Sequence, residues 1–255
     1  MARYSLHMSF DAYILCTSPR SGSTLLINML ATTGVAGDPG SFFHRDTAEG
    51  WAEALGIAPS ADRQALLKAI FAAVLPKGRG QSDVFGMRLQ AHSLDRFLGA
   101  LAELHPEQAT DKHRIERVFG PTAFIYLHRD SALERAVSYL RARQSGVWHM
   151  AADGTVLERK AAEVLPGYDA HAIATQIEAF EAYDAAWEDW FSANAITPHR
   201  VDYDALNTDP RSVLADVLTA LALDPKHAQD VSPGTRKLAD ATSQDWMWRY
   251  LNEHP

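Results

Sequence analysis

The sequence has 255 residues, 47% of them hydrophobic, and a formal net charge of −8 from 24 basic and 32 acidic residues. This length and apolar content can bury one sizeable core, so we predict a single domain over residues 1–255. The acidic excess argues against nucleic acid or an anionic membrane as a partner, because such surfaces are bound by clustered lysine and arginine. One cysteine excludes an internal disulfide, and the 11 histidines show no paired ligand spacing, so no metal site is predicted.

The beginning of the chain lacks the continuous apolar segment of a secretory signal. His7, Ser9 and Asp11 interrupt it, and no later apolar run approaches the length that spans a bilayer. We therefore expect a cytoplasmic protein without integral membrane contact.

Short apolar segments alternate with helical patterns along the chain. The predicted strands are 13–17, 84–89, 123–128 and 199–203. The apolar spacing predicts helices at 22–34, 47–56, 60–75, 93–104, 131–145, 169–194 and 209–222. This alternation predicts an α/β fold, with a central parallel sheet and helices on both faces. The turn-rich segments 145–168 and 224–245 are predicted as loops.

Residues 16–24, Cys-Thr-Ser-Pro-Arg-Ser-Gly-Ser-Thr, connect the first strand to the first helix. A tight turn leading into a helix N-terminus presents backbone N–H groups to an anion. Its one cation is Arg20, whose planar fork suits an oxyanion. A Walker A loop is excluded because Ser23 stands where that motif has lysine. The predicted anion-binding residues of the turn are Ser18, Arg20, Ser21, Gly22, Ser23 and Thr24.

The string Thr17 to Thr24 resembles the 5′-phosphosulfate loop of sulfotransferases that use 3′-phosphoadenosine-5′-phosphosulfate (PAPS). Its continuation through residues 33–43 is similar to the bacterial carbohydrate sulfotransferases of the trehalose 2-sulfotransferase and lipopolysaccharide (nodulation-type) group. The similarity recurs at 84–92, 122–148, 201–210 and 236–250. The resemblance implies the P-loop-like sulfotransferase fold and PAPS as sulfate donor.

A second phosphate site is predicted where the third strand ends. Arg129 follows that strand, and Ser138 lies nine residues further on, in the next helix. The resemblance implies that these two residues hold the 3′-phosphate of PAPS. The structural alternative is a surface ion pair of Arg129 with Asp130 or Glu134. The resemblance also implies that Arg236 closes over the cofactor.

The general base is ambiguous in the sequence. In the trehalose enzymes a glutamate directly before a Phe-Phe pair is thought to take the acceptor proton, and Ser41 stands at that position here. His44 can replace it as base, with Ser41 at the acceptor, or Asp38 can reach in from its loop. The third possibility is that the protein binds PAPS but transfers poorly.

The acceptor site is predicted from the same resemblance. Arg88 corresponds to a family lysine at the end of the second strand, and its structural alternative is a pair with Asp83 or Asp95. Gln144 and Trp148 match a string that lines the acceptor cleft in the group. Phe42, Phe43 and Trp51 are predicted to form an apolar patch that contributes to a homodimer interface or, as exposed aromatic residues in a cleft, binds a sugar, with Phe42 selected for the acceptor site.

These residues predict sulfuryl transfer from PAPS to a hydroxyl of a carbohydrate or glycolipid. No metal is required, because a sulfuryl group carries one negative charge that arginine and hydrogen-bond donors can stabilise. A phosphotransferase or ATP-binding protein is the main alternative, which would need an acidic Mg²⁺ ligand such as Asp202 or Asp204. The other is a non-catalytic nucleotide-binding module, favoured by Ser41.

Overall fold

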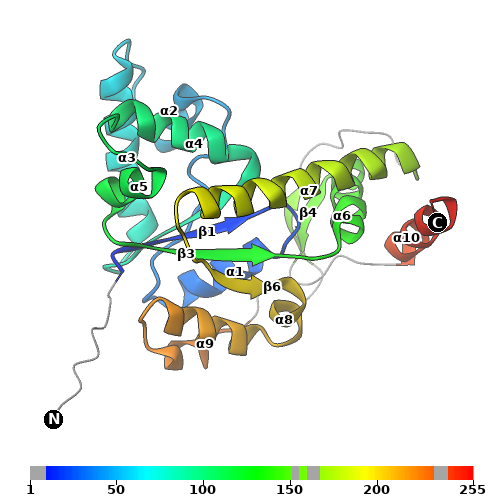
Figure 1. Ribbon diagram of the computed structural model, residues 1–255. Helices are drawn as coiled ribbons and strands as arrows, with labels where there is room; N and C mark the ends of the chain where they lie inside the picture. The colour runs from blue at the N-terminus through cyan, green and yellow to red at the C-terminus, as the bar shows by residue number, and fades with distance from the viewer. Residues whose placement is uncertain (1–9, 151–154, 160–166, 233–240, 255) are drawn as a thin grey trace.

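The computed structural model describes residues 10–150, 155–159, 167–232 and 241–254. Its centre is a four-stranded sheet in the order β2-β1-β3-β6, and every pairing is parallel (Figure 1). The strands are β1 (Ala12–Thr17), β2 (Phe85–Gln90), β3 (Thr122–His128) and β6 (His199–Asp202). All four predicted strands and their parallel arrangement are confirmed.

Helices cover both faces of this sheet. One face packs against α2 (Ala48–Leu55), α3 (Arg63–Arg79), α4 (Ala91–Leu104), α5 (Asp111–Phe119) and α7 (Ala170–Ala193). The other packs against α1 (Ser23–Thr32), α8 (Tyr203–Thr208), α9 (Pro210–Ala220) and the 3₁₀ turn η1 (Pro225–Ala228).

The residues of β1 alternate between these two layers. Ile14 and Cys16 belong to the first core, whereas Tyr13 and Leu15 belong to the second. A strand buried on both faces is apolar throughout, which is why it could be recognised in the sequence. Cys16 is fully buried, and this burial raises the pKa of its thiol.

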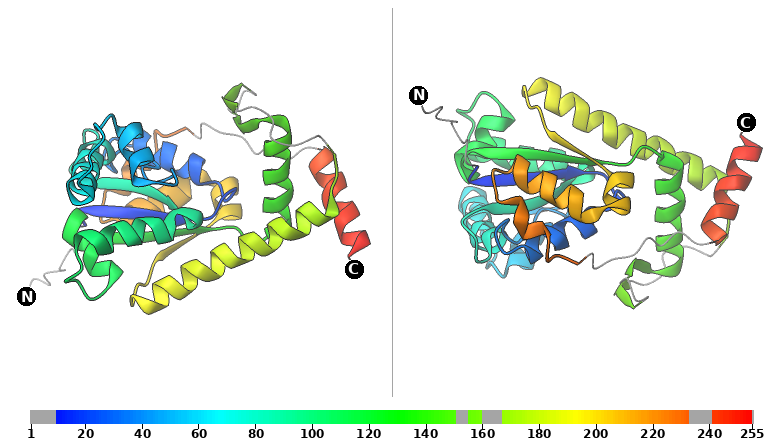
Figure 2. Two further views of the ribbon diagram at one scale, coloured as in Figure 1. Left: turned by 90° about the horizontal axis from the view of Figure 1, so that it is seen from above. Right: turned by 90° about the horizontal axis from the view of Figure 1, so that it is seen from below.

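Helix α7 extends beyond the sheet to a third apolar cluster. At one end Trp187 is buried against the sheet, and further along Phe180 packs with α6 (Ala132–Ser145) and α10 (Ala241–Glu253). Figure 2 shows α7 running from the sheet to these two helices. Among the described residues, no helix is long and apolar enough to cross a membrane.

Helix starts follow the polar caps in the sequence. Asp209 accepts a hydrogen bond from the backbone N–H of Ser212 at 3.1 Å, and Pro210 is the first residue of α9. Asp169 caps α7 through Ala172 N–H at 2.9 Å. These side chains satisfy donors that the first helical turn leaves without backbone partners.

Several expectations were wrong in detail. Residues 145–168 are not only loop, because β4 (Val147–Met150) and β5 (Val156–Arg159) form an antiparallel hairpin. Segment 224–245 contains η1 and the start of α10. Helices α5 and α8 were not predicted. The segments that contain the hairpin, η1 and the start of α10 were predicted as loops because their Gly and Pro residues are typical of turns, and α8 has only six residues in which a periodic pattern could stand out.

The adjacent phenylalanines Phe42 and Phe43 have different surroundings. Phe43 is 1% exposed, and its ring centroid lies 4.9 Å from that of Phe97 and 5.1 Å from that of Trp51. Phe42 is only partly buried and lies 6.3 Å from the Phe85 ring. Phe43 and Trp51 are therefore core residues, which corrects the prediction that they form an exposed apolar patch, whereas Phe42 keeps a surface for other contacts.

We predict that Phe43→Ala lowers the free energy of unfolding by about 3–5 kcal/mol, because it removes a fully buried ring and leaves a cavity. Phe42→Ala is the matched control, with a smaller loss expected because its ring is partly solvated already. Urea denaturation of both variants measures the difference. Equal losses would contradict the assignment of Phe43 to the core.

Candidate functional site

The turn between β1 and α1 leaves a helix N-terminus open. Gly22 precedes the helix in a left-handed conformation (φ 81°), and no described side chain caps the first turn. Within the turn, Ser21 Oγ donates to the carbonyl oxygen of Ser18 at 2.9 Å. A helix start whose N-cap residue has no capping side chain can offer backbone N–H donors to an anionic ligand.

Arg88 is the cation that contacts the hydroxyls of this turn. At the end of β2, its Nη1 donates to Ser23 Oγ at 3.2 Å and to Thr24 Oγ1 at 3.0 Å. Its Nε donates to Ser41 Oγ at 2.7 Å. The structural alternative predicted an ion pair of Arg88 with Asp83 or Asp95, whereas these contacts are to hydroxyl groups. The guanidinium thus joins the start of α1 to the segment that contains Ser41.

Arg20 points toward α6 rather than toward the start of α1. Its Nε donates to Ser138 Oγ at 3.0 Å, and its Nη1 donates to the Trp148 carbonyl oxygen at 2.9 Å. Arg20 itself has a positive φ of 65°. The structure thereby brings together Arg20 and Ser138, two predicted site residues that are far apart in the sequence.

Arg129 completes this second group. Its Nη1 donates to the Arg20 carbonyl oxygen at 3.3 Å, and its Nη2 forms an ion pair with Glu134. The guanidinium lies 4.2 Å from the centroid of the Tyr203 ring. The structural alternative, a surface ion pair of Arg129 with Asp130 or Glu134, is right about the partner Glu134. It is wrong in placing Arg129 at the surface, because this residue is only 6% exposed.

His44 is exposed, and its Nδ1 lies 2.7 Å from the carbonyl oxygen of Ser41. Since a carbonyl only accepts, Nδ1 is the donor in this contact, which leaves Nε2 as the acceptor nitrogen of a neutral imidazole. Asp38 instead lies against Gly80, and its charge acts on Tyr13, near the amino end of β1. The turn before α1 is at the other end of that strand.

The remaining predicted residues have varied surroundings. Gln144 is bound to the backbone of Gly167, donating to its oxygen at 2.7 Å and accepting from its nitrogen at 3.1 Å. Trp148 lies in β4, with its ring 5.7 Å from that of Tyr139. Arg236 lies outside the described residues.

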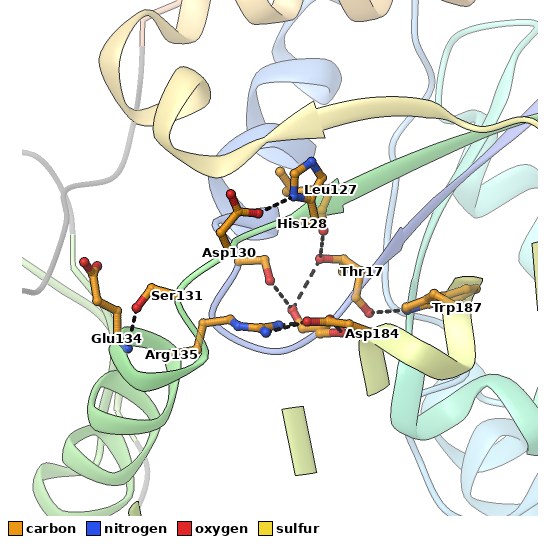
Figure 3. Close-up of polar contacts among 11 residues, drawn as sticks. Thr17, Leu127, His128, Asp130, Ser131, Glu134, Arg135, Asp184 and Trp187 are labelled. Carbon is orange, nitrogen blue, oxygen red and sulfur yellow. Dashed lines mark hydrogen bonds and ion pairs between the residues drawn. The ribbon is translucent and has the colours of Figure 1, made fainter. Parts of the chain in front are cut away.

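Sequence reasoning missed a buried polar group behind the turn. Ser18 Oγ donates to Asp184 Oδ1 at 2.8 Å, and Arg135 forms an ion pair with the same carboxylate. Trp187 Nε1 donates to the Thr17 carbonyl oxygen at 3.0 Å. Figure 3 shows Asp184 facing Arg135, with Thr17 and Trp187 beside them. Nothing in the local sequence of α7 marks Asp184 or Trp187 for this role.

His92, in the first turn of α4, is a second histidine near Arg88. Its ring centroid lies 6.3 Å from that of Tyr183, in α7. Partial withdrawal of the ring from water lowers the pKa of His92, and the charges of Arg96, Arg88 and His44 act in the same direction, whereas Asp46 opposes them. A neutral imidazole is favoured there. No motif in the sequence marks His92 for a role in the site.

One group could hold a metal ion among the described residues. Ligand atoms of His128, Asp130 and Asp202 all lie within 4.8 Å of one another. His128 Nδ1 lies 3.2 Å from Asp130 Oδ1, while Asp202 accepts from Ala205 N–H at 2.8 Å and so caps α8. These contacts give the three side chains structural roles that need no ion.

Solved structures offer distant likenesses. The sulfotransferase domain of the Synechococcus PCC 7002 olefin synthase is 17% identical, with a TM-score of 0.46 over 96% of this chain and 86% of that one. A sulfotransferase from Alicyclobacillus acidocaldarius is 13% identical, with the same TM-score, over 96% of this chain and 92% of that one.

Two characterised relatives are closer in sequence. The chain is 30% identical to a trehalose 2-sulfotransferase of Mycobacterium tuberculosis strain Erdman over 269 aligned positions, and 30% identical to one of Mycolicibacterium smegmatis over 262. Each alignment covers 95% of both proteins. The family described as Stf0 sulphotransferase matches residues 12–253. Since that match spans nearly the whole chain, this protein belongs to the Stf0 sulphotransferase family and is a sulfotransferase.

Proposed function

We propose that this enzyme moves a sulfuryl group from PAPS to a hydroxyl of a carbohydrate or glycolipid. The observation that carries the proposal is a pair of arginine-containing groups where β1 and β3 end. One is the uncapped start of α1 with Arg88, and the other joins Arg20, Ser138 and Arg129. Two such groups suit a nucleotide with anionic groups on both its 5′ and its 3′ side.

On the 5′ side, we assign the phosphosulfate to the turn before α1. The backbone donors around Gly22 and the hydroxyls of Ser23 and Thr24 would bind it, with Ser18 and Ser21 holding the turn in shape. PAPS supplies an activated sulfuryl group whose leaving group is adenosine 3′,5′-bisphosphate.

On the 3′ side, we assign the phosphate to Arg129 and Ser138. Arg20 already donates to Ser138, so this arginine would serve the 3′ side as well as the turn that contains it. Glu134 pairs with Arg129 in the described structure, and the incoming phosphate would compete with that carboxylate for the guanidinium. Arg236 is proposed to close over the adenine side.

At the acceptor, Arg88 and His44 have separate tasks in the proposed mechanism. Arg88 reaches both the turn hydroxyls and Ser41, so its charge can stabilise the sulfuryl oxygens during transfer. His44 uses Nε2 to accept the acceptor proton, because Nδ1 is held by the Ser41 carbonyl. Asp38 is less suited, since its neighbours lie near the other end of β1.

The acceptor class rests on the two trehalose 2-sulfotransferases, so trehalose is the first acceptor to test. Phe42 and Trp148 offer aromatic surface for a sugar ring. Gln144 is occupied by Gly167 and would have to exchange that contact to bind a sugar. Ser41 replaces the expected glutamate, so the acceptor can differ from trehalose. A homodimer and a cytoplasmic location stay predictions.

The alternatives have less support. A Mg²⁺-dependent phosphotransferase requires acidic ligands committed to an ion, whereas Asp202 already caps α8. A non-catalytic module was suggested by Ser41, but His44 next to it has a nitrogen available as a base. The family membership favours the enzyme over both.

For the proposed function, the first prediction tests which nucleotide the protein binds. Adenosine 3′,5′-bisphosphate should raise Tm more than ATP with Mg²⁺, since a ligand at about 100 times its Kd adds about 2.7 kcal/mol to the unfolding free energy. Arg20→Ala should weaken bisphosphate binding at least about tenfold, because a hydrogen bond to a charged group contributes about 1.5–3 kcal/mol. Scanning calorimetry and titration calorimetry measure these effects. Equal stabilisation by ATP with Mg²⁺ would contradict the assigned donor.

The second prediction tests the base. His44→Ala should lower kcat with trehalose or another active acceptor by about 10²–10⁴-fold, the usual contribution of a general base. Bisphosphate affinity should stay unchanged, because His44 acts on the acceptor. Adding Ser41→Glu to this variant restores a carboxylate at the family position and should recover part of the turnover. Undiminished kcat in His44→Ala would rule out the role.

The third prediction concerns His92. Its pKa in the folded protein should fall below that of an ordinary histidine, and Arg96→Ala should raise it, because a positive neighbour is removed and Asp46 loses its 3.1 Å ion pair with Arg96. NMR titration measures both values. An unchanged or lower pKa in Arg96→Ala would contradict the assigned cause.

The lowered pKa of His92 determines how this residue changes the unfolding free energy as the pH varies. The unfolded chain binds the His92 proton more readily, so this residue's contribution is fully present above the unfolded pKa. It is lost as the pH falls through the folded pKa. Denaturation at several pH values should show that His92→Gln reduces the acid sensitivity of the unfolding free energy.

A further inference from the structure

Asp184 connects two parts of the protein that carry different halves of the proposed nucleotide site. Its Oδ1 accepts from Ser18 Oγ at 2.8 Å and from Arg135 Nη1 at 3.0 Å, while Oδ2 receives Arg135 Nη2. One carboxylate on α7 is therefore bound by the turn before α1 and by α6 at the same time, as the close-up in Figure 3 shows for Arg135.

These two partners lie next to the two proposed anion-binding groups. One is the turn before α1 with Arg88, and the other joins Arg20, Ser138 and Arg129. Ser18 begins the turn, and its carbonyl oxygen accepts from Ser21. Arg135 is on α6, three residues before Ser138 and therefore on the same side of that helix. The position of Asp184 thus bears on the distance between the turn and α6.

The helix that carries Asp184 is itself attached to the sheet. Trp187, fully buried three residues further along α7, donates its Nε1 to the Thr17 carbonyl oxygen at 3.0 Å. Thr17 Oγ1 in turn donates to the Leu127 carbonyl oxygen at 2.9 Å, across β1 and β3. Asp184 therefore contacts Ser18 and Arg135 from a helix that is itself hydrogen-bonded to the sheet.

Burial and charge make this arrangement costly as a purely structural device. Arg135 is 1% exposed, and its Nε is buried without a hydrogen-bond partner among the described residues. Asp184 keeps 29% of its side chain exposed. A buried ion pair is often no more stabilising than apolar residues of similar size, so its presence points to a role in fixing geometry.

We infer that Asp184 is a positioning residue that fixes the separation between the 5′ and 3′ anion sites. It thereby sets the preference for a nucleotide phosphorylated at both positions over one phosphorylated at a single position. This inference rests on the proposed function.

The expected preference for the bisphosphate follows from the free-energy cost of binding one rigid ligand at two sites. When the sites are held at the ligand's own spacing, the second anionic group binds without further ordering of the protein. If the separation fluctuates, a nucleotide with one phosphate still fits either site, but the gain from the second phosphate is reduced. A loss restricted to the doubly phosphorylated ligand therefore distinguishes positioning from general damage.

The experiment measures three affinities by titration calorimetry: adenosine 3′,5′-bisphosphate, adenosine 5′-phosphate and adenosine 3′-phosphate. In Asp184→Asn the preference for the bisphosphate over both monophosphates should fall at least about tenfold, with the monophosphate affinities nearly unchanged. Glu188→Gln is the matched control, one turn along α7, where the carboxylate pairs with Arg200 at 2.7 Å on the surface. It should retain all three affinities.

A second variant covers the possibility that Asp184→Asn leaves Arg135 unpaired and prevents folding. Combining Asp184→Asn with Arg135→Met removes the buried charge, and the same loss of preference is expected from a protein whose Tm shows that it folds. In the double variant Asp184→Asn with Glu188→Gln, the changes in nucleotide affinity should equal the sum of those in the two single variants, because the two carboxylates have different partners.

The outcomes separate this inference from the proposed function. A retained preference in the Asp184 variants, or an equal loss for all three nucleotides, overturns the positioning role while the donor assignment stands. If the unaltered protein shows no preference for the bisphosphate, the proposed donor is wrong, and the inference fails with it.

Discussion

The packing of the Tyr203 ring on Gly22 is the constraint on which both proposed anion-binding groups depend. A Cβ at residue 22 would lie 2.8 Å from Cδ2 of that ring, and the positive φ there is unfavourable for other residues. The same ring lies 4.2 Å from the Arg129 guanidinium. Tyr203 begins α8 directly after β6, so the pairing of β6 with β3 sets its position. The start of α1 and Arg129 are therefore held relative to one another through the sheet.

The sheet and the turn before α1 were predictable because their signals are local. Strand β1 is apolar at every position from Ala12 to Leu15, as burial on both faces requires. The turn contains a glycine, several hydroxyls and one arginine within nine residues. The β4–β5 hairpin was missed, because the glycines and prolines at 146, 154, 166 and 167 around its strands are typical of a loop.

The contacts within the site could not be predicted in the same way. Arg20 is close in sequence to Ser23 but bonds to Ser138, whereas Arg88 bonds to Ser23 from the neighbouring strand. A long side chain has many rotamers, and its direction depends on tertiary partners that the local sequence does not reveal. Asp184 is a stronger case: in a long helix rich in acidic residues, an aspartate is most often solvent-exposed.

Ser41, at the position where the resemblance implies a glutamate, bears on what Arg88 can do. A carboxylate at position 41 would attract the guanidinium and neutralise much of its charge. The Ser41 hydroxyl accepts one hydrogen bond at 2.7 Å and leaves the charge of Arg88 uncompensated by that residue. An arginine can also contact Ser23, Thr24 and Ser41 at once through its separate nitrogens, which the compact ammonium of a lysine does less well. Serine at 41 and arginine at 88 are therefore compatible with each other. In the proposed mechanism this pair gives up a base at 41 and keeps the charge of Arg88 available to the sulfuryl group, so the acceptor proton is removed by a neighbour such as His44.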